Sequence, residues 1–136
     1  MTTIHLETSK THVFRCGVTV AGTHATWPLA EILMTDSGVT IEPTWRWLGL
    51  FFPPVYRLGW DDVDRVELLV TFGTPRGLRF VLSRPATVRR PLGALFAVWP
   101  GAVRRIRVGL RTADLEAALT LVPSEIPVRR LRWLGP

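Results

Sequence analysis

The chain has 136 residues, of which 47% are hydrophobic, and its formal net charge is +6. This length corresponds to about one domain, and it is enough to bury one hydrophobic core without disulfide or metal support. The single cysteine, Cys16, excludes an intramolecular disulfide, and residues 1–10 show no secretion-signal pattern. The uncharged apolar run 91–103 is shorter than the roughly 20 residues that span a bilayer. We therefore expect a cytoplasmic protein, with peripheral attachment at the inner face of the membrane as an alternative.

The positive charge is concentrated in the C-terminal part of the chain. Residues 84–136 hold ten Arg against three Asp and Glu, whereas residues 1–83 are nearly neutral. All but one of the 17 basic residues are Arg, and Asn and Gln are absent, which is typical of a GC-rich bacterial genome. The asymmetry indicates either an anionic partner for one face or a solvated surface that keeps the protein soluble.

Apolar and polar residues alternate in seven segments, and this period of two predicts β-strands. The expected strands cover 12–20, 29–35, 39–47, 56–60, 66–72, 78–82 and 106–110. The stretches "TDSG" at 35–38 and "GTPRG" at 73–77 have the composition of tight turns. The sequence therefore predicts a mainly β, antiparallel fold.

After the seventh strand the apolar period becomes that of a helix. One apolar stripe has the spacing i, i+3, i+4, i+7 and consists of Leu115, Ala118, Leu119 and Val122. We expect a helix over 112–122 whose apolar stripe covers the open end of a barrel formed by the strands. Thr112 is the expected N-cap, and Pro123 ends the helix. The remaining residues, 123–136, form a basic tail without a clear period. The predicted organisation is an N-terminal arm at 1–11, one domain at 12–122 and this tail.

Three stretches carry a resemblance to a known fold. They are "PLAEILMTDSGVTI" at 28–41, "YRLGWDDVDRVELLV" at 56–70 and "RIRVGLRTADLEAALTLV" at 105–122. As strands followed by a terminal helix, they resemble the bacterial PH-like domains of the pleckstrin-homology superfold. The resemblance implies a seven-stranded antiparallel PH-like barrel or sandwich over 12–122, closed by one C-terminal α-helix.

Lipid-binding members of that superfold are known for a basic loop between the first two strands, which holds an inositol phosphate. The corresponding loop here, "AGTHATWP" at 21–28, contains no Lys or Arg. A neutral loop lacks the charge-assisted hydrogen bonds that grip several phosphates. We therefore do not expect a phosphoinositide site in this loop.

The chemistry-bearing residues do not assemble into a catalytic motif. Cys16 lies on the apolar face of the first expected strand, which is typical of a core thiol rather than a nucleophile. His5, His12 and His24 lack a zinc-ligand spacing, and an acidic turn such as 61–64 is more often a solvated corner than a cation site. No phosphate-binding glycine motif occurs. The sequence predicts a noncatalytic protein without metal, cofactor or small-molecule substrate.

Two apolar segments are bracketed by arginines. The first, 47–56, lies between Arg46 and Arg57, and the second, 91–103, lies between two Arg pairs. Three explanations stay open: the segments pack on each other, they contact a protein partner or a second copy of the chain, or they rest on an anionic membrane. Aromatic anchors rimmed by Arg are typical of protein interfaces.

We therefore predict an interaction module that binds a protein partner or self-associates, with anionic lipid as the alternative. The predicted interaction surface consists of Arg46, Trp47, Leu50, Phe51, Phe52, Arg57, Arg89, Arg90, Leu95, Phe96, Trp99, Arg104, Arg105 and Arg107. A nucleic acid is the least favoured partner. Single-strand binders combine Arg with stacking aromatics, and beside the outward Arg79, Arg105 and Arg107 only Trp133 has such a position.

Overall fold

A computed structural model of the chain describes residues 10–20, 23–45, 55–89 and 103–133. The described elements are β1 (His12–Val20), β2 (Thr23–Met34), β3 (Gly38–Pro43), β4 (Val55–Gly59), the short 3-10 turn η2 (Trp60–Asp62), β5 (Val63–Thr71), β6 (Thr74–Leu82), β7 (Thr87–Arg89), β8 (Arg105–Gly109), α1 (Thr112–Leu121) and β9 (Val128–Arg132). The mainly β fold with one C-terminal helix is confirmed.

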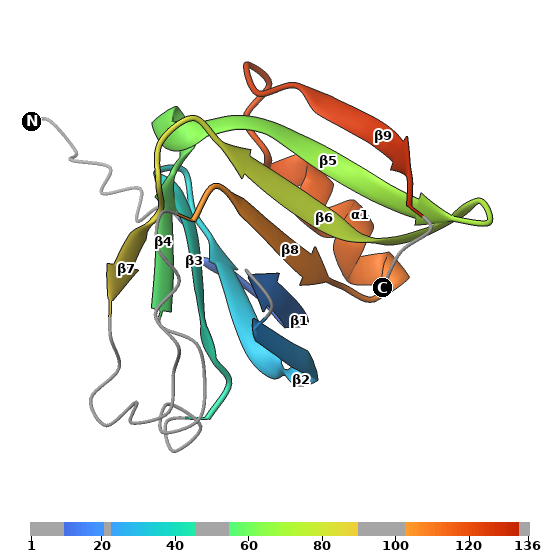
Figure 1. The fold of residues 1–136 in the computed structure, drawn as a ribbon, viewed down its shortest axis with the longest axis horizontal. Helices are drawn as coiled ribbons and strands as arrows, with labels where there is room; N and C mark the ends of the chain where they lie inside the picture. Colours follow the sequence, from blue (N-terminus) through green and yellow to red (C-terminus); the bar gives the residue numbers. More distant parts are fainter. Residues whose placement is uncertain (1–9, 21–22, 46–54, 90–102, 134–136) are drawn as a thin grey trace, which may run out of the picture.

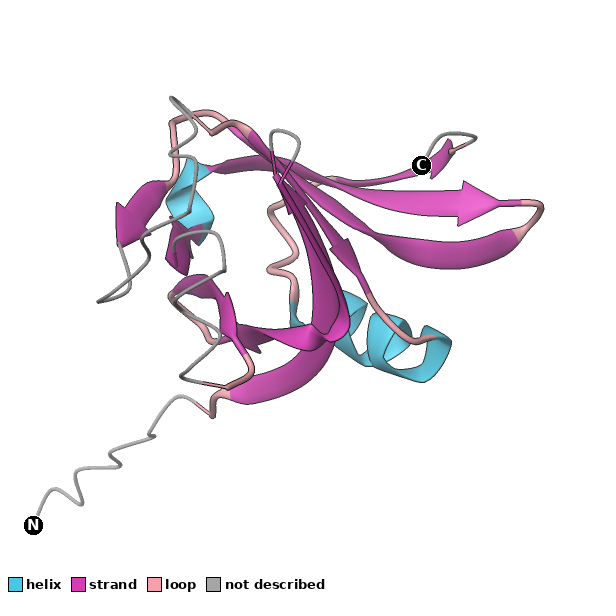
Figure 2. Cartoon of the chain, turned by 60° about the horizontal axis from the view of Figure 1, so that its bottom comes forward, coloured by secondary structure: helices cyan, strands magenta, loops and turns pink. Residues whose placement is uncertain are grey.

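The strands form one sheet in the order β7-β4-β3-β2-β1-β8-β6-β5-β9. Two antiparallel meanders, β1 to β4 and β5-β6-β8, are joined where β1 pairs with β8. The last strand, β9, pairs parallel with β5 and lies at the opposite edge from β7 (Figure 1). Among the described strands the sheet is therefore open, and it curves strongly (Figure 2).

One face of the curved sheet carries the hydrophobic core. Because successive strand residues point to opposite faces, the alternation seen in the sequence puts Val18, Phe80 and Val108 on this inner face, where they are buried. Helix α1 adds Leu115 and Ala118 to the same core and lies behind β5 and β6 in Figure 1. We call the opposite side of the sheet the outer face.

The structure has nine described strands rather than the seven predicted. The additional ones are β7, which is only three residues long, and β9, which lies in the tail that showed no period. Most of β9 is exposed, with Val128 46% accessible, so burial imposes no alternation on this edge strand. Strand β9 is held by backbone pairing with β5, and the order of side chains in the sequence does not predict this pairing.

Several predicted boundaries are wrong. The expected loop 21–28 is a strand from residue 23 onward, because β1 and β2 continue to pair beyond the irregularity opposite Gly17. The third strand ends at Pro43, where Thr44 makes one more backbone bond to the Leu29 carbonyl before the chain bends at 44–45. The predicted continuation to residue 47 falls partly outside the described residues. Thr112 is the first helical residue rather than the N-cap, because the backbone is still extended at Arg111.

Candidate binding groove on the outer face

Three glycines lie side by side on the outer face, one on each of three neighbouring strands. Gly17 of β1 pairs with Gly109 of β8, and Gly109 pairs with Gly77 of β6. Their chain neighbours Val18, Val108 and Leu78 point into the core. Because glycine has no Cβ, this row leaves a hollow across the outer face of the sheet, which we call the groove.

The three glycines differ in how much space a side chain would have at their positions. A Cβ on Gly77 would lie 2.3 Å from the carbonyl oxygen of Val108, and one on Gly17 would lie 2.8 Å from that of Ala25. A Cβ on Gly109 would meet nothing within 4 Å. The packing of the sheet therefore requires Gly17 and Gly77, whereas Gly109 forms an open floor.

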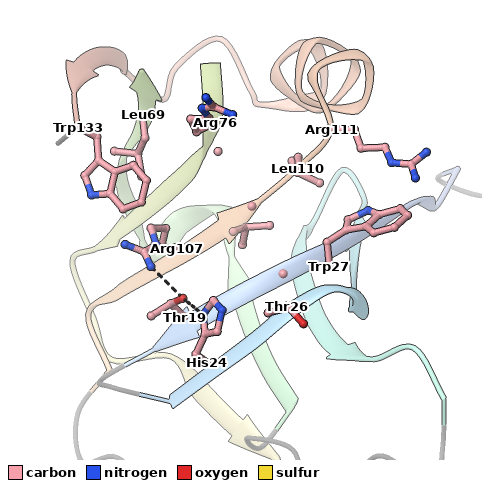
Figure 3. A pocket seen from close by; sticks show the side chains of 14 residues that line it. Thr19, His24, Thr26, Trp27, Leu69, Arg76, Arg107, Leu110, Arg111 and Trp133 are labelled. Atoms are coloured by element: carbon pink, nitrogen blue, oxygen red, sulfur yellow. Dashed lines mark hydrogen bonds between the residues drawn. The ribbon is translucent and has the colours of Figure 1, made fainter. Parts of the chain in front are cut away.

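One wall of the groove comes from the irregular part of β2. The register between β1 and β2 changes between Cys16, which pairs with Ala30, and Val18, which pairs with Ala25. The unpaired β2 residues between these two pairs include Trp27. The Arg111 guanidinium lies 3.9 Å from the centroid of the Trp27 ring, and Trp27 is 40% exposed. Figure 3 shows Trp27 and Arg111 together on one side of the groove. This arrangement is a cation–π pair at the rim.

The other wall is built by the residue that follows β9. The backbone N–H of Trp133 donates to the Val70 carbonyl at 2.8 Å, and the Thr71 hydroxyl donates to the Trp133 carbonyl at 2.8 Å. These two bonds anchor Trp133 beside buried Leu69, and the Arg107 guanidinium lies 4.5 Å from the centroid of its ring. The groove thus lies between two Trp–Arg pairs from distant parts of the chain (Figure 3).

A polar row crosses the outer face next to the glycines. Arg107 Nη2 donates to the Thr19 hydroxyl at 3.1 Å, and that hydroxyl lies 2.7 Å from His24 Nδ1 (Figure 3). Burial, and then the neighbouring charge of Arg79, lower the pKa of Arg107. An anion beside Arg107 would offset both effects, because it favours the charged guanidinium.

The lining of the groove is positively charged. Its volume is about 370 Å³, and Arg76, Arg107 and Arg111 line it together with His24, without any Asp or Glu. The nearest acid along the polar row, Glu67, is only 5% exposed and accepts a bond of 2.7 Å from Arg79. Burial alone would raise the pKa of Glu67, but the bonds and charges of Arg79 and Arg65 outweigh burial and lower it. The lining of the groove therefore combines positive charge with apolar and aromatic surface.

The surface predicted from the sequence overlaps with this groove at one residue, Arg107. Arg57 and Arg105 are exposed elsewhere, and exposed Arg104 donates to the Ser83 carbonyl at 3.0 Å. Arg89 lies in β7. The other predicted residues lie outside the described part of the chain: Arg46, Trp47, Leu50, Phe51, Phe52, Arg90, Leu95, Phe96 and Trp99.

Sequence reasoning missed most of the groove. It placed Trp133 beside outward arginines, but it assigned Trp27 to a loop and gave no role to Arg111. The available signal was an outward glycine in two predicted strands, Gly17 and Gly109, because glycine inside a strand often marks a close approach of a ligand or another backbone. Gly77 was assigned to the turn 73–77, but the structure has the turn at 72–73 and places Gly77 inside β6. The pairing that brings these glycines together comes from contacts far apart in the sequence.

Cys16 is a core residue, as predicted. It is fully buried, and burial, together with the charge of Glu31, raises its pKa to about 12. A thiol with such a pKa stays protonated at neutral pH and is a poor nucleophile. Within the described ranges, no group of three or more His, Cys, Asp and Glu side chains is arranged to hold a metal ion. The one described α-helix, α1, falls well short of the length and apolar character that crossing a membrane requires.

Comparisons with known proteins were made for the sequence and for the fold. No protein-family model matches the chain, no curated protein matches its sequence, and no solved structure matches its fold.

Proposed function

We propose that this chain is a noncatalytic binding module that holds an acidic, partly apolar segment of a partner protein in the groove. The observation that carries the proposal is the composition of the groove: two Trp–Arg pairs face each other across a glycine floor, and the lining contains no carboxylate. Aromatic residues and Arg are the side chains that most often dominate protein interfaces.

The geometry suits a peptide carboxylate. A guanidinium that stacks on an indole by its face keeps its N–H groups in its own plane, where a carboxylate can accept two of them. Arg111 on Trp27 therefore offers a preorganised carboxylate site at one wall. Gly109 leaves room for the backbone of the segment to approach the sheet, and buried Leu69 and the Trp133 ring flank the space for an apolar side chain.

The assignment to the PH-like superfold is part of this proposal. Two meanders that meet through β1 and β8, followed by one helix that packs on the core, support a PH-like architecture. The curvature of the sheet is in keeping with it (Figure 2). In this chain the proposed binding surface is the outer face rather than the loop between the first two strands.

The noncatalytic part of the proposal rests on what surrounds the reactive groups. Cys16 is buried on the inner face, away from the groove. Thr19 and His24 form a hydroxyl–imidazole pair, but no Asp or Glu lines the groove to orient the imidazole as a general base. The arginines of the walls offer charge and hydrogen bonds, which suits binding.

The test uses isothermal titration with two synthetic octapeptides, one alternating Glu and Leu and one alternating Lys and Leu. The acidic peptide should bind, and Arg111→Gln should weaken it about tenfold, because a hydrogen bond to a charged group is lost. Arg57→Gln is the matched control, since Arg57 is exposed on β4 outside the groove. Equal binding of both peptides, or an equal loss in both variants, would contradict the proposal.

A second copy of the chain is one protein that could supply the acidic segment. Asp61 is exposed in η2, the turn before β5, and this residue could supply the carboxylate. Asp64, exposed at the start of β5, is paired with Arg65. Light scattering decides this point: a mass above 15.3 kDa that falls in the Arg111→Gln variant would identify self-association as the interaction.

Single-stranded nucleic acid is the second candidate, because the structure places Trp27 as well as Trp133 at the groove. Stacking aromatics beside Arg are what such binders use. Arg79, which lies in the polar row, contributes less than the sequence implied, because its charge is paired with Glu67. An oligothymidine titrated in the same experiment separates the two candidates: tighter binding than the acidic peptide would favour nucleic acid.

A further inference from the structure

The β5–β6 hairpin ends in a residue that the fold does not need. Thr71 pairs with Thr74, so Phe72 and Gly73 form a two-residue turn, with φ of 50° and 77°. Phe72 is also 91% exposed. Turns of this kind need positive φ at both central positions and favour Asn or Gly, whereas a bulky side chain is strained there.

Phe72 therefore costs the protein stability and contributes nothing to the core. Its backbone occupies a conformation that is unfavourable for phenylalanine, and its ring gains nothing from burial in the core. Strain of this type persists where a side chain serves a purpose other than folding. The purpose of Phe72 must be sought outside the molecule.

The surroundings of Phe72 are cationic. A hollow beside the turn is lined by Val70, Phe72, Gly73, Arg130 and Arg132, and both arginines are exposed. Neither the turn, "VTFGTPR", nor the adjacent end of the chain, "VRRLRW", contains an Asp or Glu. In Figures 1 and 2 the hairpin projects beyond the rest of the sheet, with the end of β9 close to its base in Figure 1.

We infer that this hairpin tip docks on an anionic phospholipid surface. Phe72 would enter the boundary between headgroups and acyl chains, while Arg130 and Arg132 contact lipid phosphates. A projecting tip with one aromatic ring suits insertion, since a stable protein contact needs about 800 Å² on each partner. This site is separate from the groove, because Gly109, Trp27 and Arg111 do not belong to it.

The experiment is co-sedimentation of the full chain with vesicles of phosphatidylcholine alone or mixed with an equal amount of phosphatidylglycerol. Binding should require phosphatidylglycerol and should weaken at high salt, because ions screen the arginines. Phe72→Asn should weaken binding about tenfold or more, which is the worth of burying a phenyl ring. Replacing Arg130 and Arg132 by Gln should weaken binding about fivefold for each arginine.

Two controls keep a loss of binding interpretable. Phe72→Asn should raise the thermal midpoint by about 4 °C, because Asn tolerates the left-handed backbone, so lost binding cannot be ascribed to unfolding. Val13→Asn removes another half-exposed apolar side chain, on β1, and should bind vesicles like the wild type. The inference is overturned if the wild type ignores anionic vesicles at low salt, or if Phe72→Asn binds them equally well. It is also overturned if the wild type is oligomeric without binding vesicles and Phe72→Asn is monomeric.

Discussion

The inner and outer faces of the same strands follow different rules. On the inner face, Val18, Leu78 and Val108 are large apolar residues packed together without solvent contact. On the outer face, the adjoining positions hold glycines, and polar and aromatic side chains surround them. The strand geometry is common to both faces, but burial constrains only the inner one. On the outer face, close backbone packing fixes Gly17 and Gly77, whereas Gly109 and the surrounding polar and aromatic positions are not constrained in this way.

The two faces should respond differently to substitution. Changes on the inner face should act on the free energy of unfolding. On the outer face, some substitutions should clash with the neighbouring backbone and lower stability, whereas others should fit without a clash. Only the substitutions that fit can change binding affinity without also changing stability. The glycine row contains both kinds of position: Gly77 has no room for a side chain, whereas Gly109 has open space.

The largest effect is expected for Phe80→Ala on the inner face. Phe80 is fully buried on β6. Its truncation should lower the free energy of unfolding by about 3–5 kcal/mol, through lost burial and the cavity left behind. Chemical denaturation followed by circular dichroism measures this change. A loss below about 1 kcal/mol would place Phe80 outside the core.

A smaller loss is expected for Gly77→Ala on the outer face. The new methyl group would lie 2.3 Å from the Val108 carbonyl oxygen, so the paired backbones must move apart. We expect a cost of about 1–3 kcal/mol, as for other overpacked sites. Gly109→Ala is the matched control, and it should leave stability unchanged or raise it, since its methyl group has open space. Equal losses in both variants would show that steric contact with β8 is not the cause.

Glu67 provides a pH-dependent test of the polar row. Its pKa is lowered from 4.5 in the folded state, so its contribution to stability is present above about pH 4.5 and is lost as the pH falls through the folded pKa. Glu67→Gln should cost about 1–2 kcal/mol at pH 7, because Arg79 loses its charged partner. The variant should also lose less stability than the wild type on acidification below pH 4.5. Parallel pH profiles for the two proteins would contradict this role.

The inner face could be predicted from the sequence in some detail. The first strand, His12–Val20, has the bounds that its alternation indicated, and Cys16 is buried in the core as expected. The helix ends within one residue of its prediction, and Leu115 is its buried anchor, whereas Leu119 is only partly buried. Burial imposes these patterns on the sequence, so the sequence carries them.

The outer face could not be predicted in the same way. Trp27 meets Arg111, and Trp133 meets Arg107, through pairings between strands that are distant in the chain. Strand β9 is held by backbone bonds to β5, which leave no pattern in its exposed side chains. Local patterns report which side of a strand is buried, but they do not report which strands are neighbours.

Gly109→Val tests most directly whether the outer face is a binding surface. Its side chain would fill the groove floor, where nothing lies within 4 Å of the Cβ position, so the fold should persist with a thermal midpoint at or above that of the wild type. Affinity for the alternating Glu-Leu peptide, measured by titration on the same preparation, should fall at least about tenfold. A folded Gly109→Val variant that binds this peptide as tightly as the wild type would show that the groove is not the binding site.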